Sequence, residues 1–340
     1  MSNILEIKNL TTEFDTDQGV VSAVRDVSFY VKEKEVIGIV GESGSGKSVA
    51  MFSVMGILAD NGRITSGTVT FDGKDISGAN LDKKQFKEYE KKMQKIRGND
   101  MSMIFQDPMT FLNPVLKIET QLIEPIILHT KCSKKEAVEK AISLMEQVGI
   151  SSARERIKQY PHQFSGGMRQ RIIIAMALAC NPKLIIADEP TTALDVTIQA
   201  QVLELIQKLS QDSDTSVIMI THDLGVVASM CHRILIMYGG KIVEEGTDEE
   251  IFYNAHHPYT LGLLNSINDP SKNVKEELKP IPGSPPDLLR PPVGCPFVDR
   301  CEKAMVICKE QLPEDTILSD THICRCWLEH EYAKEVKLNG

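Results

Sequence analysis

The sequence contains no long hydrophobic run and no excess of basic residues. No apolar stretch approaches the roughly 20 residues that a membrane-spanning helix needs. Acidic residues outnumber basic ones, 47 to 38, and the formal net charge is −9. Surfaces that bind nucleic acid are usually basic. The composition therefore argues against nucleic acid as a partner, and the chain is not expected to cross a membrane alone.

The first residues also lack the basic segment and apolar core of a secretory signal. We therefore expect a cytosolic location, where thiols stay reduced. The eight cysteines then need an explanation other than disulfide bonds. Clustering of cysteines indicates a metal site rather than scattered core packing. The cysteines that cluster near the end of the sequence are Cys295, Cys301, Cys308, Cys324 and Cys326.

The most informative stretch is a glycine-rich loop after an apolar strand. The run VIGIV at 36–40 predicts a buried strand, and it ends at GESGSGKS, residues 41–48. Glycines allow successive backbone N–H groups to converge on an anion, and the following helix adds its positive N-terminal dipole. The loop is thus predicted to cradle phosphate, with Lys47 on the β- and γ-phosphates and Ser48 on Mg²⁺. A flexible Gly/Ser loop is the alternative, and the strand before and helix after disfavour it.

The segments around this loop predict a sheet and a solvated helix. Residues 4–10 and 19–31 alternate apolar and polar side chains, which predicts half-exposed antiparallel strands. Phe14 lies in the polar link between them, where it could either stack on a purine base or belong to the core. Residues 67–73 predict another strand and turn. The Lys/Glu-rich segment 81–97 predicts a solvated helix or a linker without a site.

Two neighbouring carboxylates follow a second buried strand. LIIADEP at 184–190 predicts a parallel strand that ends at Asp188 and Glu189. Adjacent buried acids are costly unless a cation or ligand balances them. Asp188 therefore suits Mg²⁺ bound through water, and Glu189 suits the polarisation of water that attacks a γ-phosphate. The alternative is a pair of helix N-cap residues.

Two more predicted strands end at polar side chains. A short strand ends at Gln106 before a helix-breaking proline, which is a weak signal alone. The last predicted strand, 216–220, is followed by His222. A lone histidine is usually structural. In an open α/β sheet, however, such strand ends line the ligand crevice.

A mostly helical insertion separates the loop from the acidic strand. Residues 117–149 show apolar side chains at helical spacing and close at Gly149. The sequence FSGGM at 164–168 then leads into a predicted helix at 172–180. A Ser-Gly-Gly turn at a helix N-terminus can bind an anion, although a simple cap would be favoured for the segment by itself. Residues 192–195 predict a turn.

Together these motifs resemble the nucleotide-binding subunit of an ATP-binding cassette (ABC) transporter, over residues 1–250. The resemblance identifies 41–48 as the Walker A loop, 184–188 as Walker B, 164–168 as the signature, and 192–195 as the D-loop. Phe164 and Met168 are mild departures from the usual signature. The catalytic residues that it implies are Glu189, His222, Lys47 and Gln106. The implied nucleotide-binding residues are Phe14, Gly41, Ser43, Gly44, Ser45, Gly46, Lys47, Ser48, Ser165, Gly166, Gly167, Asp188 and Asp195. The implied Mg²⁺ ligands are Ser48, Gln106 and Asp188.

The implied fold is an α/β ABC-type P-loop ATPase core with an antiparallel β subdomain. A helical insertion of about 86–165 interrupts this nucleotide-binding domain, and residues 251–340 form a small cysteine-rich C-terminal module. FQDPM at 105–109, HPYT at 257–260 and GCPFVDRC at 294–301 resemble dipeptide and oligopeptide import ATPases, which share the pattern with nickel importers.

The last part of the chain lies beyond a proline-rich linker at 279–286, which is expected to be stiff. Few large apolar side chains follow, and so small a segment seldom folds without a staple. The cysteine spacing could bind an iron–sulfur cluster or zinc, and zinc sites favour tighter spacing. The resemblance points to a [4Fe–4S] cluster and fits Cys326 better than Cys324. Free buried thiols are the remaining alternative. The expected cluster ligands are Cys295, Cys301, Cys308 and Cys326.

The resemblance implies ATP hydrolysis that drives dipeptide or oligopeptide import, with ATP and Mg²⁺ as cofactors. The implied partners are a second ABC ATPase subunit, identical or paralogous, two membrane permease subunits and, indirectly, an extracytoplasmic peptide-binding protein. The implied location is peripheral, at the cytoplasmic face of the cell membrane. The alternatives are nickel or other metal import, a soluble non-transport cassette ATPase, and a redox sensor. Distance in sequence predicts that the cysteines are dispensable for phosphate chemistry.

Overall fold

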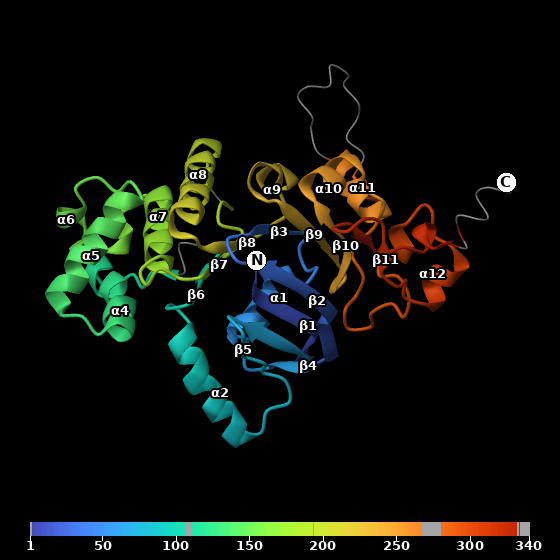
Figure 1. Cartoon of the computed structure of the whole chain (residues 1–340), viewed down its shortest axis with the longest axis horizontal. Coiled ribbons are helices and arrows are strands. Elements are labelled where there is room, and N and C mark those ends of the chain that lie inside the picture. The colour runs from blue at the N-terminus through green and yellow to red at the C-terminus, as the bar shows by residue number, and fades with distance from the viewer. Residues whose placement is uncertain (1, 107–110, 193, 267–279, 332, 334–340) are drawn as a thin grey trace, which may run out of the picture.

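A computed structural model describes residues 2–106, 111–192, 194–266, 280–331 and 333 (Figure 1). Positions 107–109 of the predicted FQDPM motif lie outside the described residues, as do Ala193 of the predicted turn and Lys279 of the linker. No helix in the described ranges is both long and apolar enough to cross a membrane.

The centre of the molecule is a mostly parallel sheet with the strand order β11-β12-β10-β9-β3-β8-β7-β6. Four strands were predicted within it, and their side chains are buried throughout, as parallel strands covered on both faces require. These strands are β3 (Val36–Val40), β6 (Met101–Ile104), β7 (Leu184–Asp188) and β8 (Ser216–Thr221).

The prediction that 216–220 is the last strand was wrong. β9 runs parallel to β3, and β10 pairs with β9 in the antiparallel direction. An apolar run forms β9, so the missed signal was present in the sequence. The later strands are β9 (Arg233–Tyr238), β10 (Lys241–Thr247), β11 (Thr316–Ile317) and β12 (Ile323–Cys324).

A second, antiparallel sheet has the order β2-β1-β4-β5, which confirms the predicted antiparallel strands. Phe14 does not lie in a polar link. It lies inside β1, where it pairs with Val21 on one side and Gly62 on the other. The alternating pattern therefore continues past residue 10, and the link is only a tight turn. The strands are β1 (Asn3–Thr16), β2 (Gly19–Lys32), β4 (Gly62–Phe71) and β5 (Lys74–Asp75).

The predicted insertion is mostly helical, and its part from residue 118 to residue 156 forms the left side of the molecule in Figure 1. The helix after the Ser-Gly-Gly turn begins at Gly166 rather than at residue 172, because the Ser165 hydroxyl caps it. The helices up to that point are α1 (Lys47–Met55), α2 (Lys83–Ile96), α4 (Ile118–Thr130), α5 (Lys134–Gln147), α6 (Ala153–Arg156), η1 (Pro161–Gln163) and α7 (Gly166–Ala177).

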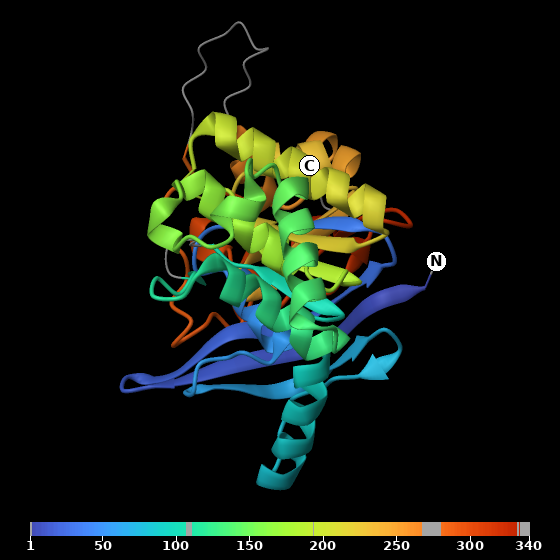
Figure 2. The same cartoon turned by 90° about the vertical axis from the view of Figure 1, so that its left-hand side faces the viewer.

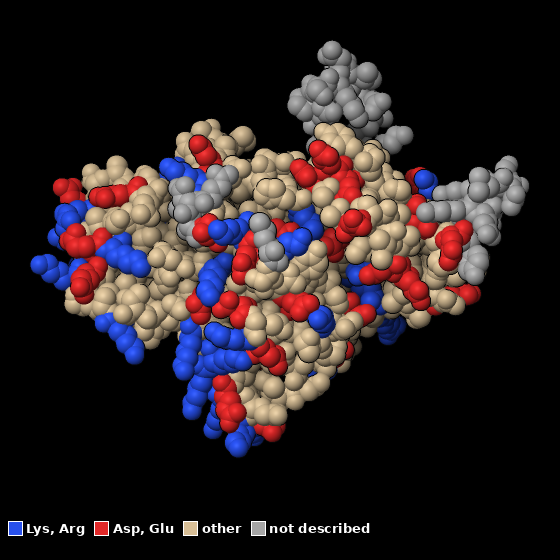
Figure 3. Space-filling model, in the orientation of Figure 1, with Lys and Arg blue, Asp and Glu red and all other residues tan. Residues whose placement is uncertain are grey.

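Helix α2 projects from the body below the antiparallel sheet (Figure 2). Its lysines form a basic cluster in Figure 3, whereas both signs mix over the rest of that face. The remaining helices are α8 (Val196–Ser213), α9 (Leu224–Met230), α10 (Asp248–Tyr253), α11 (Pro258–Asn265), η2 (Val298–Arg300), α12 (Val306–Glu310) and η3 (Trp327–Glu329).

Two apolar cores hold the layers together, and β3 contributes to both. Val36 and Val40 pack in the core shared with the helical insertion. Ile37 and Ile39 point the other way, into the core shared with the antiparallel sheet. This alternation follows from the two-residue period of a strand. The loop after β3 is consequently anchored from both faces of the sheet.

The C-terminal segment, which is the described part of residues 251–340, packs against the central sheet. β12 pairs with β10, so that Cys324 lies opposite Glu244. The buried Glu244 carboxylate accepts hydrogen bonds from the backbone N–H groups of His256 and His257, and it lies 2.9 Å from His322 Nε2. Residues 280–286 of the predicted linker contain no helix or strand, and neither do the residues that follow up to 297.

Candidate active site

The glycine-rich loop connects β3 to α1, and its glycines are required by close packing. A Cβ at Gly41 would lie 2.1 Å from the Met237 carbonyl oxygen. A Cβ at Gly46 would lie 2.3 Å from the Ala23 carbonyl oxygen, and φ of 98° at Gly46 favours glycine as well. These close contacts therefore restrict the backbone conformation of the loop where it enters the N-terminus of α1. Amides at a helix N-terminus can bind an anion.

Lys47 is buried, with 5% of its surface exposed. Its Nζ atom donates hydrogen bonds to the carbonyl oxygens of Gly41 at 2.7 Å and Glu42 at 2.8 Å. Burial lowers the pKa of Lys47, whereas the carboxylates of Glu189, Asp188 and Glu42 act to raise it. The loop thus holds a cation beside the helix N-terminus, which suits a phosphate group.

Ser48 and Asp188 meet beside Lys47. The Ser48 hydroxyl donates a hydrogen bond of 2.8 Å to Asp188 Oδ1. Asp188 is 3% exposed, and burial raises the pKa of its carboxyl group. Hard oxygen ligands of this kind suit Mg²⁺, and a nearby cation would favour the charged carboxylate. The pair therefore fits the magnesium site that the sequence predicts.

Glu189 directly follows β7 and has a left-handed backbone, with φ of 45°. Its Oε2 atom accepts hydrogen bonds of 2.9 Å from Gln106 Nε2 and from Thr192 Oγ1. Its Oε1 atom lies 3.2 Å from His222 Nδ1. The ends of β6, β7 and β8 thus bring three predicted catalytic residues into contact, as the strand-end argument expects. Thr192 adds a contact on Glu189 that sequence reasoning did not single out.

The signature turn and the D-loop residue both cap helices. Ser165 Oγ accepts from the Met168 N–H group at 3.3 Å, and Asp195 accepts from the Ile198 N–H group at 3.0 Å. Ser165 and Gly166 are exposed, and a Cβ at Gly166 would meet no atom within 4 Å. Among the described residues, no hydrogen bond joins this turn to the loop at 41–48.

Phe14 is half-buried on β1, where its ring packs against Gly62. A Cβ at Gly62 would lie 2.7 Å from that ring, so the glycine makes room for the aromatic side chain. Stacking of Phe14 on a base stays a prediction.

Four cysteines of the C-terminal segment lie together. Burial is the main cause that raises the pKa of Cys295 to about 12, and the neighbouring thiols of Cys326, Cys308 and Cys301 contribute to the same rise. The Cys295 N–H group also donates to the Cys308 carbonyl oxygen at 2.8 Å. Cys324 differs, because its main charged neighbour is Glu244. Within the described part of the chain, no group of three or more His, Cys, Asp or Glu side chains is arranged to hold a metal ion.

Arg300 and Glu42, which sequence reasoning missed, connect these cysteines to the phosphate loop. Arg300, which precedes Cys301, forms two hydrogen bonds with the Glu42 carboxylate, at 2.7 and 3.1 Å. An acidic residue within a phosphate-binding loop is a signal that a cation must balance it. The sequence could not show which of the basic residues does so.

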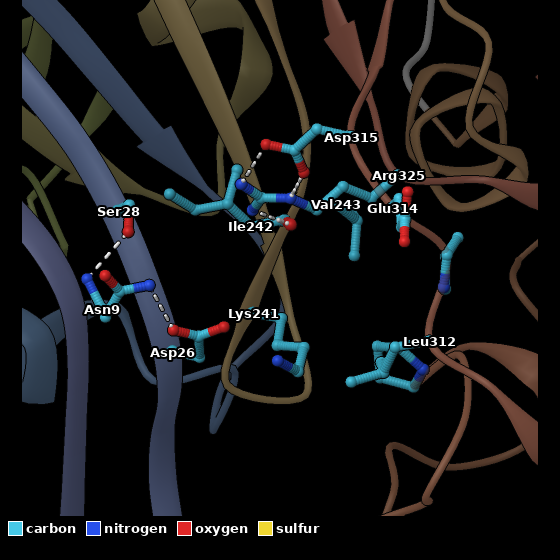
Figure 4. Close-up of a pocket in the computed structure, with 12 residues that line it drawn as sticks. Asn9, Asp26, Ser28, Lys241, Ile242, Val243, Leu312, Glu314, Asp315 and Arg325 are labelled. Carbon is cyan, nitrogen blue, oxygen red and sulfur yellow. Dashed lines mark hydrogen bonds and ion pairs between the residues drawn. The ribbon is translucent and has the colours of Figure 1, made fainter. Parts of the chain in front are cut away.

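A cleft of about 330 Å³ lies where the C-terminal segment meets β1, β2 and β10 (Figure 4). Asn9 Nδ2 donates to Asp26 at 2.8 Å on one side of the cleft, and Arg325 pairs with Asp315 on the other. The contact between Arg325 and Asp315 is an ion pair. None of the predicted site residues lines this cleft.

The fold described above matches that of solved ABC cassettes. A dimeric post-hydrolysis state of the cassette MJ0796, bound to ADP and Pi, aligns with a TM-score of 0.62 and 28% identity, covering 72% of this chain and 98% of that chain. The family model described as ABC transporter matches residues 24–192. The fold is therefore that of an ABC-type ATPase.

Comparison with other sequences narrows this class. The dipeptide transport ATP-binding protein DppD of Bacillus subtilis is 51% identical over 341 residues, covering all of this chain and 99% of that protein. The oligopeptide transport ATP-binding protein OppD of Salmonella typhimurium is 50% identical, covering 91% of this chain and 89% of that protein. The family model for the oligopeptide/dipeptide transporter C-terminal region matches residues 243–308. The chain belongs to the ATP-binding subunits of the dipeptide and oligopeptide ABC transporter family.

Proposed function

We propose that this ATPase drives import of dipeptides or oligopeptides through membrane permease subunits. The observation that carries the proposal is the convergence of Gln106, His222 and Thr192 on Glu189, beside the Ser48–Asp188 pair. Peptide rather than nickel is the favoured cargo, because the relatives reported above are named for dipeptide and oligopeptide transport. The same relatives disfavour a soluble, non-transport ATPase.

The residues around Glu189 have different roles in ATP hydrolysis. Lys47 and the loop amides bind the β- and γ-phosphates, because they supply a buried cation and a helix N-terminus. Mg²⁺ held by Ser48, Asp188 and Gln106 would neutralise charge on the phosphate oxygens. The Glu189 carboxylate orients the attacking water and accepts its proton. Gln106 contacts Oε2 of this carboxylate and His222 contacts Oε1, so the two residues together fix the orientation of the carboxylate.

The complete ATP site requires a second cassette, because the signature turn of one subunit would contact the nucleotide bound by the phosphate loop of the other. The Ser165-Gly166-Gly167 turn is exposed or half-exposed and suits a phosphate held by another subunit's loop. The related cassette structure is itself dimeric. We infer an identical or paralogous ATPase partner, two permease subunits and, indirectly, an extracytoplasmic peptide-binding protein. The complex would be peripheral at the cytoplasmic face of the membrane, and Phe14 and Asp195 would complete the nucleotide contacts.

The cysteine-rich module, residues 251–340, is proposed to hold a [4Fe–4S] cluster. The chemistry of the donors fits, because Cys295, Cys301, Cys308 and Cys326 are near neighbours and are half or mostly buried. Zinc remains the alternative occupant.

Co-purification tests the proposed partners. A tagged chain is isolated from solubilised membranes, and the bound proteins are identified by mass spectrometry. Two permeases and a cassette are the expected result. ATPase activity of the complex should rise with dipeptides or oligopeptides in the presence of the binding protein, and nickel should have no effect. Stimulation by nickel alone, or isolation of the chain with ribosomes, would contradict the proposal.

A further inference from the structure

The C-terminal segment holds Glu42 of the phosphate loop at two points. The Glu42 N–H group donates to the Tyr259 hydroxyl of α11 at 2.9 Å. The Glu42 carboxylate accepts hydrogen bonds from both terminal nitrogens of Arg300, at 2.7 and 3.1 Å. Two-point binding of a carboxylate by arginine fixes orientation as well as charge. The second residue of the loop is therefore positioned by a segment more than 200 residues away, since 258 positions separate Glu42 from Arg300.

All three nitrogens of the Arg300 guanidinium group donate hydrogen bonds, which hold the side chain in place. Its Nε atom donates to the Pro282 carbonyl oxygen at 2.8 Å, and its terminal nitrogens also donate to the Ile281 carbonyl oxygen and the Tyr238 hydroxyl. The guanidinium group lies over the rings of Tyr238 and Phe297. Only 6% of the side chain is exposed. Such a side chain cannot move without moving its neighbours.

Those neighbours carry the cysteines. Arg300 ends η2 and directly precedes Cys301, and Phe297 follows Cys295 by two positions. The Phe297 ring packs edge-on against Tyr238, with centroids 5.2 Å apart, and lies 5.4 Å from Tyr259. The position of Arg300 thus depends on the same short segment that places two of the four clustered thiols. Displacement of this segment would withdraw the arginine from the loop.

The charge of Glu42 explains why this contact matters to nucleotide binding. The loop binds a polyphosphate, and an unbalanced carboxylate within it would repel that anion. The charge of the Glu42 carboxylate also acts to raise the pKa of Lys47. Arg300 neutralises the carboxylate from the side of the C-terminal segment. Lys47 then remains available to phosphate.

We propose that Arg300 is a positioning residue of the phosphate loop, through which the metal-bound state of the four cysteines sets the affinity for ATP. This inference rests on the proposed function, since it assumes that the cysteines hold a metal group. It replaces the expectation that the cysteines are dispensable for phosphate chemistry. The contact between Arg300 and Glu42 could not be seen from their separation in sequence.

Charge removal on each side of the contact tests the first part. Affinity for a fluorescent ATP analogue with Mg²⁺ is measured for Arg300→Met, Glu42→Gln and the double variant of the full chain. Arg300→Met should weaken binding about tenfold, within the range of roughly 5- to 150-fold for coupled sites. Glu42→Gln should restore most of the loss in the double variant, because the repelling charge is gone. A purely structural role for Arg300 predicts no such rescue.

Arg325→Met is the matched control, because Arg325 also pairs with an acid of the C-terminal segment, Asp315, at the cleft of Figure 4. Its affinity should stay within about twofold of the parent. Arg300→Lys keeps the charge and serves if Arg300→Met does not fold, and it should bind ATP more tightly than Arg300→Met. Parent-like affinity of folded Arg300→Met, or a double variant as weak as Arg300→Met, would overturn the inference.

Metal removal tests the second part. Anaerobically purified parent chain is compared before and after chelation, with ATP affinity and protease resistance as readouts. Chelation should weaken ATP binding by the parent but not by the Glu42→Gln, Arg300→Met double variant, which has lost the contact. Equal affinity before and after complete metal loss, or a chain that purifies without metal, would overturn this part. A parent that never binds ATP would instead contradict the proposed function.

Discussion

A hydrogen bond of 2.9 Å joins Gln106 to Glu189 across 83 positions of the chain. The two residues meet because β6 and β7 are parallel neighbours whose carboxyl ends share one edge of the sheet. A change at the Gln106 end would therefore be transmitted to the carboxylate that is proposed to orient water. The helices at 118–156 follow Gln106 in the sequence, so this bond joins the strand end that precedes these helices to Glu189.

Glu189→Gln should keep ATP affinity and lose turnover. The carboxylate faces its polar neighbours at the strand ends, whereas Lys47 and the loop hold the phosphates. Loss of a general base typically costs about 10²- to 10⁴-fold in rate. Steady-state ATPase assays and nucleotide-binding measurements on the same preparation separate the two effects. Hydrolysis within about threefold of the parent would show that the role is misassigned.

The isolated chain should be a poor ATPase whose specific activity rises with protein concentration. The signature turn is exposed, and we propose that it contacts a nucleotide bound by the phosphate loop of another subunit. Activity is measured over a concentration series, alongside the oligomeric state by light scattering. Addition of the partner cassette should raise activity further. Full, concentration-independent activity in a monomeric sample would refute the composite site.

Asp188→Asn should raise the melting temperature in the absence of Mg²⁺ at neutral pH. Burial raises the pKa of Asp188 above its unfolded value, so the folded state binds the proton more tightly than the unfolded chain. The associated stability is present below the unfolded pKa and is lost as pH rises through the folded pKa. Asparagine removes the buried charge and so removes that loss.

Thermal melts of parent and Asp188→Asn between about pH 4 and pH 8 check the sign, because the unfolded pKa of aspartate lies near 3.9. The difference should grow with pH in buffer without Mg²⁺ and shrink when Mg²⁺ is added, since only the parent keeps the carboxylate. A variant that melts below the parent at neutral pH without Mg²⁺ would contradict this account of Asp188.

The cysteines should separate into four that bind metal and one that does not. Cys295→Ser should remove bound metal and expose residues beyond about 290 to protease, because ligation replaces an apolar core in small modules. Cys324→Ala should do neither, since Cys324 lies on β12 beside Glu244. Iron, zinc and acid-labile sulfide are measured on anaerobically purified protein. Stoichiometric zinc without iron would eliminate the cluster.

The sequence predicts the catalytic edge of the sheet well and the C-terminal segment poorly. Strand ends at Gln106, Asp188 and His222 follow continuous apolar runs, and parallel strands place such ends together. Phe14 was misplaced because β1 continues through a polar stretch that tertiary pairing supports. The contact between Glu42 and Arg300 depends on how the linker folds back, which no local pattern encodes.

Peptide uptake into proteoliposomes tests the central claim most directly. The chain is reconstituted with its partner cassette, two permeases and the peptide-binding protein, and transport of a labelled dipeptide is followed with Mg-ATP on the side of the ATPase. Uptake should require ATP hydrolysis and should be abolished by Glu189→Gln in a complex that still binds ATP. Uptake that continues at the parental rate with Glu189→Gln would contradict the account.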